Sequence, residues 1–149
     1  MSYPELTTER MQLLGEITAV AVPAGTYSTA PTRFSMGNSY KCLVILTVGD
    51  MAATSTLDMA VLESQDAAGT GEKLIAGKAI TQLTAAGGDE HDVCFINLRT
   101  EEMDVQNEFT HLRVRVRVGT AAVCFSVVVL GDIPRAAPVD TSRATEIIA

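Results

Sequence analysis

The chain has 149 residues and a formal net charge of −7; hydrophobic residues make up 47% of it, aromatic residues 5%, and tryptophan is absent. A chain of this length fits one domain and can bury a core without disulfides or metal ions. Its negative charge repels phosphate backbones and anionic lipid, which argues against nucleic acid and membranes as direct partners.

Short apolar or alternating runs, separated by clusters of Gly, Asp, Asn and Thr, recur along the chain. This pattern is typical of an all-β sandwich or barrel. The strands are expected at residues 16–22, 40–48, 56–63, 79–84, 92–99, 110–118 and 121–130. Helix is expected only as short turns, from Thr8 to Gly15 and from Thr100 to Asn107.

The sequence therefore predicts an antiparallel β-sandwich with extended terminal arms. Residues 1–15 form an N-terminal arm or short helix, residues 16–133 form the sandwich domain, and residues 134–149 form an extended C-terminal arm. Apolar runs stay well below the roughly 20 residues of a transmembrane helix.

The last two strands are expected to form a hairpin. Gly119 occupies the first central position of a two-residue loop, which is the position that a type II′ turn reserves for glycine. The resulting register places Val116 opposite Val123 and Val114 opposite Phe125, so one side of the hairpin is apolar and faces the core.

The other side of this strand carries a row of three arginines, Arg113, Arg115 and Arg117. One interpretation is a solvated face whose arginine stems cover small side chains. The other is a docking row for a carboxylate-rich surface, since arginine suits protein interfaces. The acidic residues of the segment 101–108, Glu101 and Glu102 among them, are candidates for the opposite charge, from the same chain or from another.

Some strands are apolar on both faces, for example at residues 42–48 and 127–130. An antiparallel sheet with one face in water should alternate instead. Because assembly covers outer faces, this pattern favours a homo-oligomer.

The C-terminal segment, residues 134–149, is mostly polar and contains two prolines. Proline removes backbone donors and keeps a chain extended. The segment is either a loose terminus or an arm that lies on a neighbouring subunit. The candidate contact residues in it are Pro134, Arg135, Pro138, Ile147 and Ile148.

No pattern for catalysis, for a cofactor or for a metal stands out. Gly71 to Lys78 departs from a phosphate-binding loop in its spacing. Asp89 to Asp92 places consecutive side chains in different directions, which suits a solvated turn better than an ion site. The three cysteines lie in apolar runs and are expected to be buried reduced thiols of a protein made in the cytoplasm. We therefore expect no enzyme and no small-molecule substrate.

Residues 40–143 carry a series of loop and strand motifs that resembles small structural proteins of tailed bacteriophages, including capsid decoration proteins. The motifs are Val48-Gly49-Asp50-Met51, Asp66-Ala67-Ala68-Gly69-Thr70-Gly71-Glu72-Lys73, Gly77-Lys78-Ala79-Ile80-Thr81-Gln82-Leu83, Arg99-Thr100-Glu101-Glu102-Met103-Asp104-Val105, Phe109, Arg113-Val114-Arg115-Val116, Val127-Val128-Val129-Leu130-Gly131, and Pro134-Arg135 to Pro138-Val139-Asp140.

The resemblance implies a jelly-roll sandwich on the outer surface of an icosahedral head, where it stabilises the capsid by bridging subunits of the major capsid protein. The alternatives are a head–tail connector or tail component and, from a different class, a carbohydrate-binding module. The absence of tryptophan argues against the last, because sugar sites favour aromatic platforms.

Overall fold

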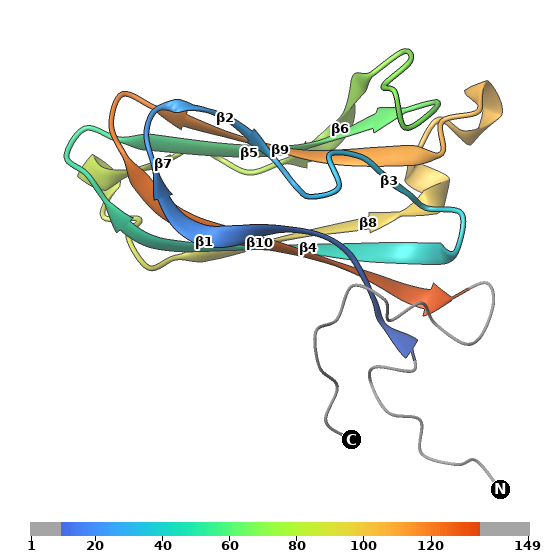
Figure 1. Cartoon of the computed structure of the whole chain (residues 1–149), viewed down its shortest axis with the longest axis horizontal. Coiled ribbons are helices and arrows are strands. Elements are labelled where there is room, and N and C mark those ends of the chain that lie inside the picture. Colours follow the sequence, from blue (N-terminus) through green and yellow to red (C-terminus); the bar gives the residue numbers. More distant parts are fainter. Residues whose placement is uncertain (1–9, 135–149) are drawn as a thin grey trace, which may run out of the picture.

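The strands pack as two antiparallel sheets, one above the other, in a computed structural model that describes residues 10–134 (Figure 1). Sheet A contains, in spatial order, β1 (Gln12–Val22), β10 (Val123–Pro134), β4 (Ser39–Met51) and β8 (Val93–Arg99). The main strands of sheet B are β2 (Gly25–Ser28), β9 (His111–Gly119), β5 (Thr56–Ser64) and β6 (Lys73–Ala79).

Two short strands and three single-turn 3₁₀ helices complete the described fold. The strand β3 (Phe34–Ser35) pairs with β9, and β7 (Leu83–Thr84) pairs with β5. The helical turns are η1 (Ala85–Gly87), η2 (Thr100–Glu102) and η3 (Val105–Asn107). No helix in residues 10–134 is long and apolar enough to cross a membrane.

The order of pairing defines a jelly roll. Leaving out β3 and β7, the first strand pairs with the last (β1 with β10), the second with the seventh (β2 with β9), the third with the sixth (β4 with β8) and the fourth with the fifth (β5 with β6). Such a ribbon of antiparallel pairs, wrapped into two facing sheets, is the jelly-roll architecture. The prediction of an all-β antiparallel sandwich of this type is confirmed.

Period-two alternation builds the core. Every second residue of β9 and β10 points between the sheets, and Leu112, Val114, Val116 and Val127 are fully buried. The largest fully buried side chain is that of Phe125, which packs edge-on against Tyr27 with ring centroids 6.0 Å apart. Aliphatic side chains therefore supply most of the buried apolar area.

The hairpin prediction is wrong. β9 pairs with β2 and β5, whereas β10 pairs with β1 and β4, so the two strands lie in different sheets and face each other across the core. Gly119, at the connection between β9 and β10, is not the first central residue of a type II′ turn. Gly119 lies opposite Thr56 of β5, where a Cβ would overlap the threonine hydroxyl, and the positive φ of 68° belongs to Thr120.

Several element boundaries also differ from expectation. β1 begins at Gln12, so residues 12–15 are strand where a helical turn was expected. The strand expected at 79–84 is replaced by β6 and the short β7, because the chain is already extended from Lys73. The short strands β2 and β3 were not predicted, since they are too brief to set up a periodic pattern. The helical turn expected from Thr100 to Asn107 is present as η2 and η3.

The three cysteines are free thiols. Cys42 is buried in β4, and its burial raises the pKa of the thiol to about 12. Cys94 and Cys124 are half-buried, and burial also raises the pKa of Cys94. The expectation of reduced thiols that behave as small apolar residues is met fully at Cys42 and in part at the other two positions.

The sandwich predicts a sharp contrast between two leucines. Leu46 is fully buried between the sheets, whereas Leu74 on β6 is 56% exposed. Leu46→Ala is expected to lower the free energy of unfolding by about 3 kcal/mol, through lost burial and the cavity left behind. Leu74→Ala is expected to change it by less than about 0.5 kcal/mol. Urea denaturation of both variants measures the difference, and equal costs would contradict the assignment of the core.

Candidate interaction surfaces

The outer face of sheet B carries the arginine row, which we define as Arg113, Arg115 and Arg117. All three alternate on β9 with core residues and therefore point away from the core, as predicted. Their neighbours differ from those expected, because the hairpin does not form. On β5, the residues opposite Arg113, Arg115 and Arg117 are Leu62, Ala60 and Asp58, in that order. On β2, Ser28 lies opposite Arg115 and Thr26 lies opposite Arg117.

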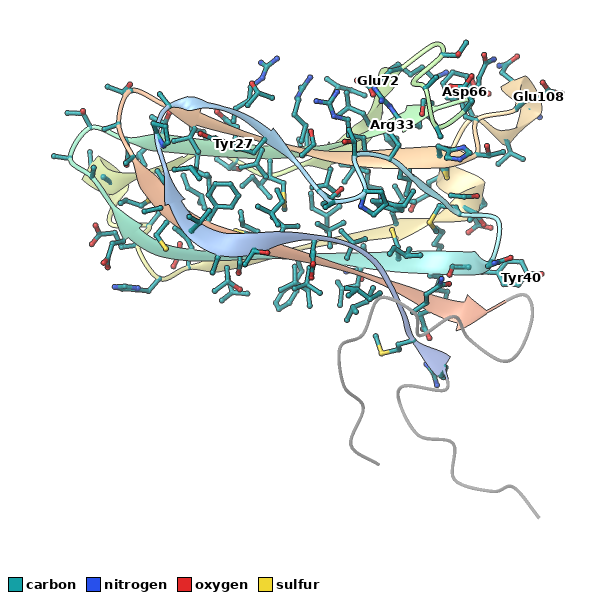
Figure 2. The ribbon with its side chains drawn as sticks, in the orientation of Figure 1. Tyr27, Arg33, Tyr40, Asp66, Glu72 and Glu108 are labelled. Carbon is teal, nitrogen blue, oxygen red and sulfur yellow. The ribbon has the colours of Figure 1, made fainter. Side chains whose placement is uncertain are left out.

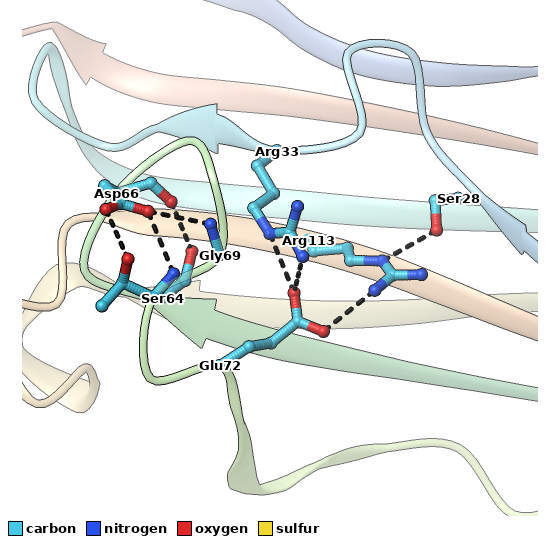
Figure 3. A network of polar contacts seen from close by, with 8 residues as sticks. Ser28, Arg33, Ser64, Asp66, Gly69, Glu72 and Arg113 are labelled. Atoms are coloured by element: carbon cyan, nitrogen blue, oxygen red, sulfur yellow. Dashed lines mark hydrogen bonds and ion pairs between the residues drawn. The ribbon is translucent and has the colours of Figure 1, made fainter.

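Arg113 is bound by the carboxylate of Glu72, which also binds Arg33 and so bridges the two arginines (Figure 3). Its Nη1 donates to Glu72 Oε1 at 2.9 Å, and its Nε donates to Ser28 Oγ at 2.8 Å. The other carboxylate oxygen of Glu72 accepts from Arg33 Nε at 2.9 Å. Since Glu72 is about one-fifth exposed, these charge-assisted bonds tie the 65–72 loop, the segment before β3 and β9 together.

A turn centred on Asp66 shapes the loop that presents Glu72, and Figure 2 places both residues at the same end of the sandwich. Asp66 Oδ1 accepts from the backbone N–H groups of Gly69 and Thr70, and Oδ2 accepts from the Thr70 hydroxyl at 2.6 Å. These bonds, the hydroxyl first, lower the pKa of Asp66 from 3.8 to about 2. Gly69 has a φ of 95°, and a Cβ there would overlap the Arg33 guanidinium, so the turn requires glycine at this position.

Arg115 and Arg117 remain available to a partner. Within residues 10–134 neither side chain makes a hydrogen bond or an ion pair, although Asp58 lies opposite Arg117 and accepts instead from Gln82. Burial, followed by the charges of Arg117 and Arg113, lowers the pKa of the Arg115 guanidinium. Two adjacent guanidinium groups that form no ion pair within residues 10–134 favour an external carboxylate.

Within the chain, the acidic segment after β8 does not supply a carboxylate to Arg115 or Arg117. Glu101 pairs with Arg99 at 3.2 Å and Glu102 pairs with Lys78 at 2.8 Å. Asp104 pairs with Lys73, and this contact lowers the pKa of Asp104. The sequence correctly identified an arginine row on an outer face, but it missed Glu72 and Arg33, which no local pattern connects with Arg113.

The outer face of sheet A has the opposite character and is named here the apolar face. Its large side chains come from all four strands of the sheet and lie on the side that alternates with core positions: Leu13, Leu43, Ile45, Val93, Phe95, Val128 and Leu130. In one row, Val128 lies beside Ile45 and Ile45 beside Phe95; in the next, Leu13 lies beside Leu130 and Leu130 beside Leu43. This agrees with the two-sided apolar runs noted in the sequence at 42–48 and 127–130.

The predicted contact residues near the C-terminus are only partly described. Pro134 is the last residue of β10 and lies opposite Ser39 in the register. Arg135, Pro138, Ile147 and Ile148 lie outside the described residues. Their assignment to an arm that contacts other subunits remains a prediction.

The acidic residues of the turn before β8 bind backbone groups of neighbouring segments. Asp89 accepts from the backbone N–H of Thr84 at 2.8 Å, and Glu90 accepts from that of Met51 at 3.2 Å. In the part of the chain that the structure describes, no group of three or more His, Cys, Asp or Glu side chains is arranged to hold a metal ion.

The fold is thus a jelly-roll sandwich with one cationic and one apolar outer face. Among solved structures it is similar to the VP2 subviral particle of infectious bursal disease virus, at 13% identity and a TM-score of 0.37, over 83% of this chain and 30% of that chain. It is also similar to a structure of the Gx strain of infectious bursal disease virus, at 12% identity and a TM-score of 0.37, over 82% of this chain and 28% of that chain.

The chain spans less than a third of the length of these two viral chains. No protein-family profile matches the sequence, and a comparison with curated proteins gives no match. The resemblance to structural proteins of tailed phages therefore remains a prediction.

The Asp66 turn predicts a defined dependence of stability on pH. Because its pKa is lower in the folded chain than the ordinary 3.8, the carboxylate stabilises the fold above that pH, and the contribution is lost as the pH falls towards 2. The urea midpoints of the wild type and of Asp66→Ala should therefore differ most near neutral pH and converge in acid. Thr70→Ala, which removes only the hydroxyl donor, should show a smaller effect of the same sign. A gap that does not change with pH would contradict this role.

The Glu72 bridge predicts a second difference in stability. Glu72→Ala leaves two partly buried guanidinium groups without their carboxylate, and it is expected to lower the free energy of unfolding by about 2 kcal/mol. Glu101→Ala removes the same functional group from an exposed ion pair and is expected to cost less than about 0.5 kcal/mol. Denaturant titration of both variants makes the comparison, and similar costs would show that the bridge does not stabilise the fold.

Proposed function

We propose that the chain is a structural protein of a tailed-phage virion, which decorates and stabilises the icosahedral capsid by bridging subunits of the major capsid protein. The observation that carries the proposal is the pair of chemically different outer faces on one sandwich. A protein that bridges subunits must offer more than one contact surface, and it needs no active site.

The arginine row suits contact with a carboxylate-rich shell surface. Arg115 and Arg117 present rigid planar donors to the outside, and the Glu72 bridge holds the neighbouring Arg113 in place. Such donors bind carboxylates in two-point geometry, and their desolvation costs less than that of lysine. The row gives the acidic chain a local cationic surface for contact with the shell, in spite of its net charge of −7.

The energetic basis of the function is multivalency. A protein that contacts two capsid subunits at once adds binding free energy across the joint between them, which opposes the outward pressure of packed DNA. The net negative charge keeps the chain away from the genome itself. The resemblance of residues 40–143 to phage structural proteins supports the same function.

The alternatives differ in copy number and in ligand. A connector or tail component assembles as a ring, so it would be present in a small, symmetric number of copies. A sugar-binding module is disfavoured by the position of Tyr27, whose ring packs against Phe125 and whose hydroxyl donates to the Pro23 carbonyl (Figure 2). That ring is consequently not free to act as an open platform.

The test is co-sedimentation of the purified chain with empty heads assembled from the major capsid protein of the virus that encodes it. Saturation at roughly hundreds of copies per head is expected, together with increased resistance of the heads to heat. Saturation at a ring-sized number would move the chain to the neck or tail, and a failure to bind would refute the capsid function.

Charge reversal on the arginine row sharpens this measurement. Arg115→Glu and Arg117→Glu are each expected to weaken binding to heads by about tenfold or more. Arg10→Glu makes the same change of charge at a side chain that is 59% exposed and pairs with Asp132, and it is expected to have little effect. Equal losses in all three variants would point to net charge and not to the row.

A further inference from the structure

The apolar face of sheet A points to a specific occupant. We propose that this face is a self-association surface, on which a second copy of the chain packs face to face with its strands antiparallel to those of the first. The inference stands independently of the proposed function, since it concerns two copies in solution and requires no shell.

The distribution of exposed apolar side chains singles out this sheet. Three of the seven large hydrophobic residues that are exposed in residues 10–134 lie on its outer face, namely Val93, Phe95 and Val128, and Leu74 is the one exposed on a strand of sheet B. Val20 and Tyr40 also belong to strands of sheet A, but their register places them on the side of the core residues Phe125 and Cys42. Phe95 is 60% exposed although it lies in the middle of β8, where a lone sandwich would place a polar side chain. A contiguous patch of this kind marks an interaction site.

The size of the face suits a stable dimer. With strands about 4.8 Å apart and a rise of about 3.3 Å per residue, sheet A covers about 700 Å². A standard protein interface buries about 800 Å² on each partner. The outer face of one sheet therefore provides close to the area that association requires.

The charges at the two ends of the face are arranged for a second copy. At one end Lys41 of β4 lies beside Arg99 of β8. At the other end lies Asp50, which is 95% exposed and whose Oδ1 lies 3.8 Å from His91 Nε2. Lys41 makes no ion pair within the described residues; Asp132, opposite it on β10, is bound by Arg10 at 3.0 Å.

These charges are placed nearly symmetrically about one cross-strand pair. Ile45 and Phe95 are register partners, and Lys41 lies four residues before Ile45 while Asp50 lies five after it. A two-fold axis that crosses the strands at this pair brings Lys41 of one copy opposite Asp50 of the other, and it stacks Ile45 and Phe95 on their counterparts. The same row ends in Glu16 on the edge strand β1, which limits the apolar contact to β10, β4 and β8 at this level. Facing sheets pack in such an aligned arrangement, about 10 Å apart. A two-fold interface requires a self-complementary surface of this kind.

The first experiment measures the mass of the full-length chain in solution over a range of concentrations, by sedimentation velocity. We expect a dimer, and we expect Phe95→Asp to raise its dissociation constant by about tenfold or more. Leu74→Asp is the matched control, since Leu74 is similarly exposed (56% against 60% for Phe95) but lies on sheet B. It should leave the dimer unchanged. Circular dichroism of both variants verifies that the fold is intact.

A charge swap tests the orientation of the two copies. Lys41→Asp and Asp50→Lys should each weaken the dimer, because each creates two like-charge contacts across the axis. The double variant Lys41→Asp/Asp50→Lys should regain most of the lost affinity, because it restores both ion pairs with their signs exchanged. Loss without recovery would refute the antiparallel orientation.

Two outcomes would overturn the self-association itself. A chain that remains monomeric at high concentration would leave the face to another occupant, such as residues 135–149 or a shell protein. A dimer that survives Phe95→Asp but is lost in Leu74→Asp would move the interface to sheet B. Neither outcome affects the head-binding measurement, so the two proposals can fail separately.

Discussion

The facing of β9 and β10 across the core is the constraint on which the rest of the molecule depends. Each is a central strand of its sheet, and their inward residues, such as Val116 and Val127, are fully buried. Because side chains alternate with period two, burial of one set commits the other set to the outside. On β9 that second set is the arginine row, and on β10 it includes Val128 and Leu130. A single packing requirement thus produces both the core and the chemical difference between the two outer faces.

The sequence predicted the sandwich, most strand positions and the side of each strand that faces the core, because alternation records those features directly. It did not predict which strands are neighbours. The apolar sides of β9 and β10 satisfy the pattern equally well as a hairpin or as two walls of a core, and only the whole sheet order distinguishes the two. The sequence could not predict the Glu72 bridge for a related reason. Arg33 lies 39 residues before Glu72 in the chain and Arg113 lies 41 residues after it, so the network exists only after the loop and β9 have come together.

Electrostatics divides the arginine row into two parts. Arg113 is neutralised by Glu72 and oriented by Ser28, so its charge serves mainly to hold the 65–72 loop against sheet B. The acidic residues that the sequence offered as partners are already bound by Arg99, Lys78 and Lys73. Arg115 and Arg117 therefore form no ion pair within the described residues, and burial and the charges of its two neighbours lower the pKa of the Arg115 guanidinium. Such a pair contributes orientation and selectivity more than raw affinity.

The two proposals combine into one geometry. When two copies pack through sheet A, their B sheets face in opposite directions, and the two arginine rows lie on opposite sides of a four-sheet stack about 30 Å thick, at about 10 Å for each sheet-to-sheet step. Such a dimer cannot lie flat on a surface with both rows engaged, but it can stand between two neighbouring acidic surfaces and contact one with each row. This is the arrangement that bridging requires. The apolar contact would join the two halves, and the arginines would select the partner on either side, so that occupation of both rows multiplies the effect of a modest affinity at each.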